Sequence, residues 1–180
     1  MRKAVLLGGA IASALFLRGY AMTRDEAASR PTSTKPAGRV LLDYQSGTTG
    51  RAHCTVVDDP FGGGGKVIHG EVVEEGKNKT TFLNDGGFFV VPPAGQGEVV
   101  LRYAVRKEAK MRVALVAASG DLKSYYFEAP SFNTWCEAVL PLKELAPKVS
   151  AGEKIVDISV WQQAGGKDAG LWVDRITLRD

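Results

Sequence analysis

The chain has 180 residues, of which 44% are hydrophobic and 24% are charged, and its formal net charge is +3. The excess basic residues, Arg2, Lys3 and Arg18, all precede residue 22, in a segment that contains no acid. Without that segment the basic and acidic residues are equal in number, so no basic stripe remains that would predict a nucleic-acid partner.

Residues 1–21 have the pattern of a secretory signal peptide. Two basic residues precede the apolar stretch 4–17, and Gly19 and Ala21 are small residues at the positions that signal peptidase reads. We therefore predict cleavage after this segment and a secreted, periplasmic or otherwise extracytoplasmic protein. The alternative is an uncleaved membrane anchor, which Arg18 directly after the apolar run favours slightly.

Residues 22–38 hold few apolar groups and two prolines, which predicts a flexible tether. Residues 39–180 are long enough for one domain with one hydrophobic core. This domain contains both cysteines, Cys54 and Cys136. In an oxidising compartment they would pair as a disulfide; the alternative is two buried free thiols, and the sequence leaves both open.

Short segments that alternate apolar and polar residues recur about every ten residues along the domain, as strands do. We expect strands at residues 39–44, 53–58, 66–74, 80–83, 88–91, 98–107, 111–117, 124–128, 135–140, 156–161 and 171–178. Helical periodicity is nearly absent, and no βαβ spacing occurs. The pattern predicts an all-β fold, an antiparallel two-sheet β-sandwich of the jelly-roll type.

The strand expected at residues 156–161 carries a tryptophan on its polar side. Val156, Ile158 and Val160 alternate with polar residues and with Trp161. Alternate side chains of a strand point to opposite faces of the sheet, so we predict that Trp161 faces away from the core.

The strand expected at residues 171–178 changes the parity of its apolar residues halfway. Two pairs would lie on opposite faces of a regular strand: Leu171 with Val173, and Ile176 with Leu178. We predict a β-bulge at Asp174-Arg175, because one extra residue would bring both pairs into the core and let Asp174 leave it.

Several short motifs occur along the domain in a characteristic order: Leu42-Asp43-Tyr44, Val57-Asp58-Asp59-Pro60-Phe61-Gly62-Gly63, Trp135 followed by Leu140-Pro141-Leu142, Gly152-Glu153-Lys154-Ile155, and Leu171-Trp172-Val173-Asp174-Arg175-Ile176. In this order they resemble the galactose-binding-like jelly rolls, and look closest to the complex-I intermediate-associated protein domain and the β-glucan-binding carbohydrate modules. The resemblance covers residues 40–180. The chain departs from the pattern at Tyr44-Gln45, where the family usually has Phe-Glu, and at Lys66, where a serine is common.

The resemblance implies a structural calcium ion where the first and last strands meet. Asp43 and Asp174 match the positions of its ligands, and Ca²⁺ prefers hard oxygen ligands. The glutamate missing at position 45 weakens this site. Alternatively, the two carboxylates pair with Arg39 or Arg175, or face water.

The resemblance also implies a carbohydrate that lies across the concave sheet. Sugar-binding proteins stack aromatic rings on pyranose faces and bond the hydroxyls with amides, acids and arginines. The outward positions that offer such groups are Trp161, Gln163, Tyr125, Tyr126, Arg102 and Arg106. Trp161 is the strongest candidate, because it is expected to face outward beside two glutamines. The alternative is an aromatic ring shielded by the following loop or by a neighbouring domain.

A metal or catalytic cluster would need His69 and Glu71, which are two residues apart and would share one strand face, with His53 approaching from the next strand. We expect instead unrelated surface residues. The sequence shows no Ser-His-Asp order, HExxH motif or phosphate-binding loop. We therefore predict that the protein is not an enzyme.

Taken with the export signal, the residues favour an exported, non-catalytic carbohydrate-binding domain. The alternative is a protein-interaction or assembly module of the cell envelope that has a protein partner and no small ligand. Membrane association is expected only if residues 1–21 stay attached.

Overall fold

A computed structural model describes residues 38–43, 50–74, 77–84, 86–93, 96–163 and 169–179. The expected signal peptide and nearly all of the tether lie outside these residues. Within the described ranges no helix has both the length and the apolar character needed to cross a membrane. The side chain of Asp43 is also outside the described part, although its backbone is within it.

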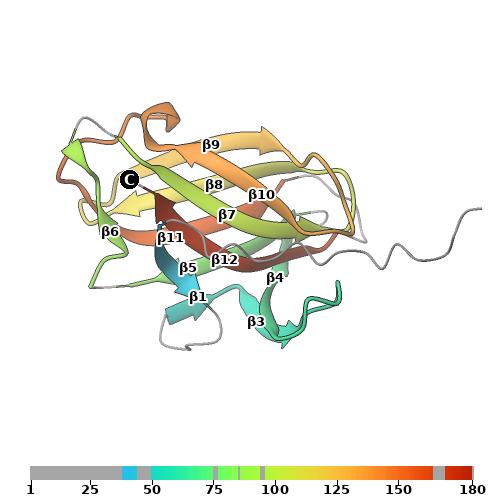
Figure 1. Cartoon of the computed structure of the whole chain (residues 1–180). Coiled ribbons are helices and arrows are strands. Elements are labelled where there is room, and N and C mark those ends of the chain that lie inside the picture. Colours follow the sequence, from blue (N-terminus) through green and yellow to red (C-terminus); the bar gives the residue numbers. More distant parts are fainter. Residues whose placement is uncertain are drawn as a thin grey trace, which may run out of the picture. The chain divides into compact units, whose positions relative to one another are not determined.

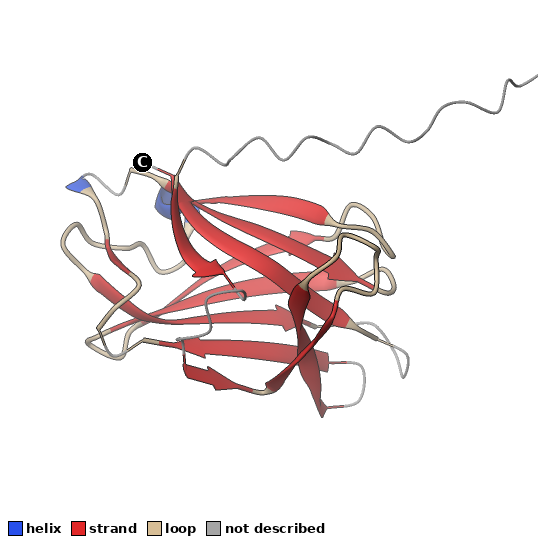
Figure 2. Cartoon of the chain, turned by 60° about the horizontal axis from the view of Figure 1, so that its bottom comes forward, coloured by secondary structure: helices blue, strands red, loops and turns tan. Residues whose placement is uncertain are grey.

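The described residues fold mainly into β-strands, with the short 3₁₀ turn η2 after β10 (Figures 1 and 2). The strands are β1 (Arg39–Asp43), β2 (Gly50–Ala52), β3 (Cys54–Asp58), β4 (Lys66–Glu74), β5 (Lys77–Leu83), β6 (Phe89–Val90), β7 (Glu98–Val105), β8 (Lys110–Ala117), β9 (Leu122–Glu128), β10 (Cys136–Pro141), β11 (Lys154–Gln162) and β12 (Leu171–Arg179). The turn is η2 (Leu142–Glu144). The predicted all-β class is confirmed.

The strands form two antiparallel sheets that pack face to face as a jelly-roll sandwich (Figure 1). Sheet A has the order β3-β4-β12-β7-β10, with β1 beside the second half of β12. Sheet B has the order β4-β5-β11-β8-β9, with β2 on β5 and β6 on β11. The first and last described strands therefore pair with each other, as expected.

Strand β4 belongs to both sheets. Its first half, up to Gly70, pairs with β3 and β12, and its second half, from Glu71, pairs with β5. Gly70 lies at the corner, where a Cβ atom would come within 3.0 Å of the Lys79 carbonyl oxygen. The close approach of the two backbones at this corner therefore favours a glycine, because a larger residue would push the Lys79 carbonyl away.

The core lies between the sheets, and the predicted bulge in β12 is confirmed. The register of β12 against β7 shifts between Val173 and Arg175. As a result, all four apolar side chains of the strand are buried in the main core: Leu171, Val173, Ile176 and Leu178.

A second bulge, in β11, was not predicted. The register of β11 against β8 shifts between Ile155 and Asp157. Ile155 therefore enters the core together with Ile158, whereas Val156 is only partly buried. The expectation that Val156 shares the core face with Ile158 was wrong, because the bulge inverts the alternation on its N-terminal side.

Two amides lie inside the sandwich among the apolar side chains. Asn78 of β5 and Gln162 of β11 face each other in the register, and Asn78 Nδ2 donates a hydrogen bond to Gln162 Oε1 over 3.0 Å. Both residues are buried. The remaining Asn78 Oδ1 and Gln162 Nε2 atoms have no hydrogen-bond partner in the described structure.

The two cysteines do not form a disulfide. Cys54 lies in β3 and Cys136 in β10, and strands β4, β12 and β7 separate them in sheet A. Four strand spacings amount to about 19 Å along a flat sheet. A disulfide requires Cα atoms within about 7 Å. The structure therefore contradicts the disulfide and shows two thiols, each partly buried against the core.

Candidate functional site

The outer face of sheet B carries a row of charged and aromatic side chains that crosses the strands. Each member lies directly opposite the next in the strand register. From β4 to β9, this cation–aromatic row consists of Glu71, Lys79, Trp161, Arg112 and Tyr126. We call the outer face of sheet B the open face.

Trp161 lies at the centre of the cation–aromatic row. Its neighbours in the strand, Val160 and Gln162, are buried on the core side, so Trp161 points outward, as predicted. The side chain is partly exposed and belongs to neither hydrophobic cluster of the described structure. A large aromatic ring is thus held on the outside of a sheet rather than in the core.

Two cations of the row lie over aromatic rings. Lys79 Nζ is 4.4 Å from the centre of the Trp161 ring, and Arg112 Cζ is 5.8 Å from the centre of the Tyr126 ring. Both distances are within the range of cation–π attraction. A ligand that contacts the Trp161 ring therefore also comes close to the positive charge of Lys79.

The guanidinium group of Arg112 is also held by a side chain of the neighbouring strand β9. Its Nε and Nη2 atoms donate hydrogen bonds of 3.1 and 3.0 Å to Ser124 Oγ. A guanidinium carries five N–H donors. Two are directed at Ser124, which leaves three for another acceptor.

A second row, parallel to the first, is made of small residues. It also points out of the sandwich, yet each member is buried: Thr81, Ser159, Ala114 and Ser124. The Thr81 and Ser159 hydroxyl oxygens are 3.1 Å apart, and Ser159 lies 3.1 Å from Asp157 Oδ1, to which it donates. Buried hydroxyl groups thus lie beside the cation–aromatic row and bond to one another and to Asp157.

Asp157 is the carboxylate at the far side of the small-residue row. Partial burial raises the pKa of Asp157, and the hydrogen bond from Ser159 and the charge of Lys79 act in the opposite direction. Lys79 and Asp157 therefore interact electrostatically across the open face.

The open face brings together three of the six predicted ligand residues. Trp161 and Tyr126 lie in the cation–aromatic row, and Gln163 follows β11 at the next outward position, partly exposed. Tyr125 faces the core side instead, with its ring 6.2 Å from that of Phe127. Adjacent residues of a strand point to opposite faces, so only one of the two tyrosines belongs to this face.

Arg102 lies in β7 of the other sheet, and Arg106 follows the last residue of that strand. The expectation that these two arginines share a surface with Trp161 was therefore wrong, because the pairing of β7 with β12 and β10 places it in sheet A. The sequence interpretation also missed Lys79 and Arg112. The sequence indicated only that their side chains point outward, and it did not show which strands lie next to theirs.

The outer face of sheet A, which we call the closed face, contains a small second core. Trp172 is only 5% exposed and packs with Val67 and Ala104 under partly buried neighbours. The ring of Phe61 meets the rings of Trp135 and Trp172 edge-on, at 5.5 and 5.2 Å. The chain therefore covers the aromatic surface of this sheet with its own loop.

Asp59 holds that loop in place. Its carboxylate accepts hydrogen bonds from the backbone nitrogens of Phe61 and Gly63, at 2.7 and 2.8 Å, and from Trp135 Nε1 at 3.3 Å. One carboxylate thus ties the glycine-rich loop to a ring of the closed face.

The two arginines of the closed face also lie over rings. Arg102 Cζ is 5.3 Å from the Trp135 ring, and Arg106 Cζ is 5.3 Å from the Trp172 ring. Arg102 forms an ion pair of 3.0 Å with Asp174, which neutralises its charge.

Asp174, one of the two expected calcium ligands, has a cationic partner in the described structure. Its carboxylate pairs with the guanidinium of Arg102 at 3.0 Å. Asp43 lies opposite Arg175 in the register. Among the described residues, no three or more His, Cys, Asp or Glu side chains are grouped so as to hold a metal ion. The calcium ion stays a prediction.

His69 and Glu71, which a metal or catalytic cluster would need on one strand face, lie in different sheets. His69 stacks on Trp172 in sheet A, with the ring centres 4.9 Å apart, whereas Glu71 follows the Gly70 corner and lies in sheet B. They do not share one face, because the strand changes sheet between them. Burial, and to a lesser extent the charge of Arg106, lower the pKa of His69.

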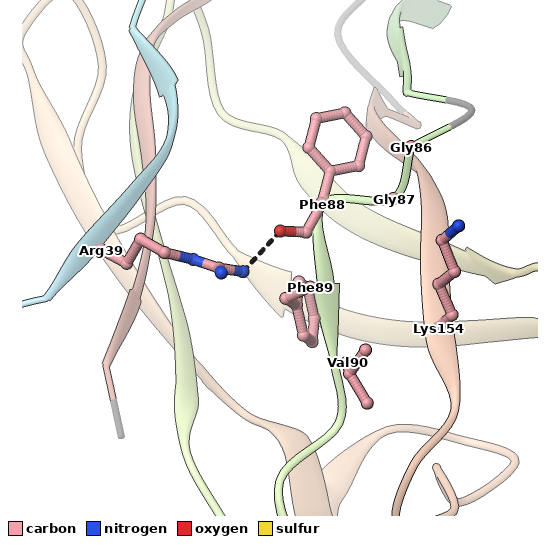
Figure 3. Close-up of a pocket in the computed structure, with 7 residues that line it drawn as sticks. All are labelled: Arg39, Gly86, Gly87, Phe88, Phe89, Val90 and Lys154. Carbon is pink, nitrogen blue, oxygen red and sulfur yellow. Dashed lines mark hydrogen bonds between the residues drawn. The ribbon is translucent and has the colours of Figure 1, made fainter.

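A separate pocket of about 180 Å³ lies at the other end of β11 from Trp161 (Figure 3). It is lined by Arg39, Gly86, Gly87, Phe88, Phe89, Val90 and Lys154. Arg39 points into it and donates a hydrogen bond to the Phe88 carbonyl over 2.5 Å. The pocket contains none of the predicted ligand residues.

No protein-family model and no curated protein matches the chain. Solved structures do. One represents carbohydrate-binding modules of the β-sandwich superfamily, with 15% identity and a TM-score of 0.51 over 81% of this chain and 64% of that one. An exo-β-agarase has 9% identity and a TM-score of 0.58 over 78% of this chain and 24% of its own.

A second agarase has 10% identity and a TM-score of 0.54 over 79% of this chain and 26% of its own. The chain thus spans about a quarter of each agarase and somewhat under two thirds of the carbohydrate-binding structure. At these identities the likeness shows the fold. The predicted resemblance to jelly-roll carbohydrate-binding modules is confirmed at that level.

Proposed function

We propose that this domain is a non-catalytic carbohydrate-binding module that holds a glycan on its open face. The observation that carries the proposal is Trp161, a partly exposed ring at the centre of a row of polar groups on the outside of a sheet. The solved structures with the same fold include carbohydrate-binding modules, which supports the proposal.

The open face offers the two kinds of contact that a sugar needs. An aromatic ring receives the apolar face of a pyranose, and donors and acceptors beside it receive the hydroxyls. Trp161 and Tyr126 provide rings, and Arg112 has N–H donors that are not directed at Ser124. The ligand on this domain is bound and not cleaved. The protein is exported by residues 1–21 and meets its glycan outside the cytoplasm.

The proposal is tested by affinity electrophoresis of the full chain in gels that contain neutral and charged polysaccharides. We expect at least one polysaccharide to retard the protein, and Trp161→Ala to weaken that binding by about tenfold or more, because a stacked ring is lost. The matched control is Phe132→Ala, which removes an exposed aromatic side chain that lies outside the open face.

Failure of every polysaccharide to retard the protein would overturn the proposal, as would binding that Trp161→Ala leaves unchanged. If no glycan binds and the full chain instead retains one envelope protein in stoichiometric amount, the assembly-module alternative is the better account.

A further inference from the structure

Two positive charges flank Trp161 on the open face. Lys79 lies beside it on β5 and Arg112 on the other side, on β8. The two strands are separated by β11, so the two backbones are about 10 Å apart, which is twice the spacing of neighbouring strands. A sugar ring stacked on Trp161 would therefore have a cation on either side.

Neither cation is neutralised by an ion pair in the part of the chain that the structure describes. The ion pairs there are Lys66 with Asp58, Arg102 with Asp174, and Lys123 with Glu153. Glu71 is opposite Lys79 in the register and Asp157 is within its electrostatic reach, but neither carboxylate comes within 4.0 Å of Lys79.

Arg112 differs in this respect from the arginine of the closed face. Its hydrogen-bond acceptor is the neutral hydroxyl of Ser124, whereas Arg102 has the carboxylate of Asp174 at 3.0 Å. The Arg112 guanidinium is thus held in place by Ser124 and by the Tyr126 ring without losing its charge. A charge that is oriented and not compensated favours an anion of the ligand.

We propose that the glycan bound on the open face is anionic, a polysaccharide whose carboxylate or sulfate groups are held by Lys79 and Arg112 on the two sides of the sugar stacked on Trp161. This inference rests on the proposed function and specifies its substrate class. Two cations on strands whose backbones are about 10 Å apart suit a polymer with repeated charges better than a ligand with one charge.

The test compares matched polymers that differ only in charge. Binding of the full chain is measured for polygalacturonate and its methyl ester, and for a sulfated galactan and the same galactan after desulfation. We expect the charged member of at least one pair to bind about tenfold or more tightly than its neutral partner. The first pair reports carboxylate recognition and the second reports sulfate recognition. Binding should weaken as salt is raised, because salt screens exposed charges.

The variants Lys79→Gln and Arg112→Gln locate the effect. Each should weaken binding of the charged polymer by about tenfold and reduce the preference over its neutral partner. Lys143→Gln is the control, since it removes the same charge from an exposed position in η2, which is not one of the strands of the cation–aromatic row. The melting temperature of each variant shows whether it is folded, and Lys79→Gln provides the test if Arg112→Gln unfolds the protein.

The outcomes separate the two proposals. Equal binding of both members of each pair, with loss of binding in Trp161→Ala, would leave the proposed function standing and overturn the anionic ligand. Undiminished preference for the charged polymer in folded Lys79→Gln and Arg112→Gln would also overturn it. If no polymer of either charge binds, the proposed function fails and the inference fails with it.

Discussion

The two outer faces of the sandwich contain similar groups and arrange them differently. On the closed face Arg106 lies 5.3 Å from the ring of Trp172, and on the open face Lys79 lies 4.4 Å from the ring of Trp161. Trp172 is nevertheless buried, whereas Trp161 is partly exposed. An aromatic ring beside a cation therefore does not by itself mark a binding surface.

The difference lies in what the rest of the chain does at each face. A loop tied down by Asp59 places Phe61 against Trp172, and Asp174 neutralises Arg102. On the open face Trp161 is partly exposed, and no described ion pair includes the cations of the cation–aromatic row. We therefore expect changes on the closed face to affect stability and changes on the open face to affect binding.

The largest expected contrast is between the two tryptophans. Trp172→Ala should lower the free energy of unfolding by about 3–5 kcal/mol, because it removes a buried ring. Trp161→Ala should lower it by about 1 kcal/mol or less, since the ring lies outside the core clusters. Denaturant unfolding of the two variants measures both values. Equal losses in the two variants would remove the distinction between the faces.

Asp59→Ala should have the next largest effect. It removes the acceptor of three hydrogen bonds that hold the loop on the closed face, at a cost of about 1–3 kcal/mol. Thermal unfolding measures the loss, and Asp58→Ala is the control, since it removes a neighbouring carboxylate whose ion pair with Lys66 is exposed. Glycan binding at the open face should be the same in both folded variants; a parallel loss of binding would mean that the faces are coupled.

A smaller effect is expected for Asp174→Asn. The ion pair with Arg102 is partly exposed, so its loss should cost about 1 kcal/mol or less. If the predicted calcium ion is bound, EDTA should lower the melting temperature of the natural protein and leave that of Asp174→Asn unchanged. A melting temperature that EDTA leaves unchanged in the natural protein would show that the ion is absent.

The smallest effect concerns pH and His69. The pKa of His69 is lowered in the folded protein, so the neutral imidazole is favoured there. Its contribution to stability is present above the unfolded pKa of about 6.5 and is lost as the pH falls through the folded value. His69→Phe keeps a ring on Trp172 and cannot titrate. The melting temperature of the natural protein should therefore fall relative to that of His69→Phe between about pH 7.5 and 5.5. Parallel profiles would show that His69 does not contribute.

The sequence pattern predicted those features of the fold that depend on local alternation. The parity change in β12 predicted the bulge between Val173 and Arg175, and the alternation in β11 predicted the outward direction of Trp161. Both follow from the two-residue period of a strand, which a single segment displays without its partners.

Strand pairing, in contrast, could not be derived from the pattern, and the candidate site depends on it. Whether Arg102 or Arg112 lies near Trp161 is decided by which strands are neighbours, and both arginines have the same outward parity. The corner at Gly70 is similar, because His69 before it pairs with β12 and Glu71 after it pairs with β5, and no local signal in the sequence marks this change. Long-range pairing is set by the whole core.

The buried amide pair lies directly beneath the open face. Asn78 and Gln162 are the inward neighbours of Lys79 and Trp161 on the same two strands. A slip of β5 against β11 by one residue would turn the ammonium of Lys79 into the core and separate the two amides. The hydrogen bond between the amides therefore favours the observed register of β5 and β11 over registers shifted by one residue. In that register Lys79 lies beside the partly exposed Trp161.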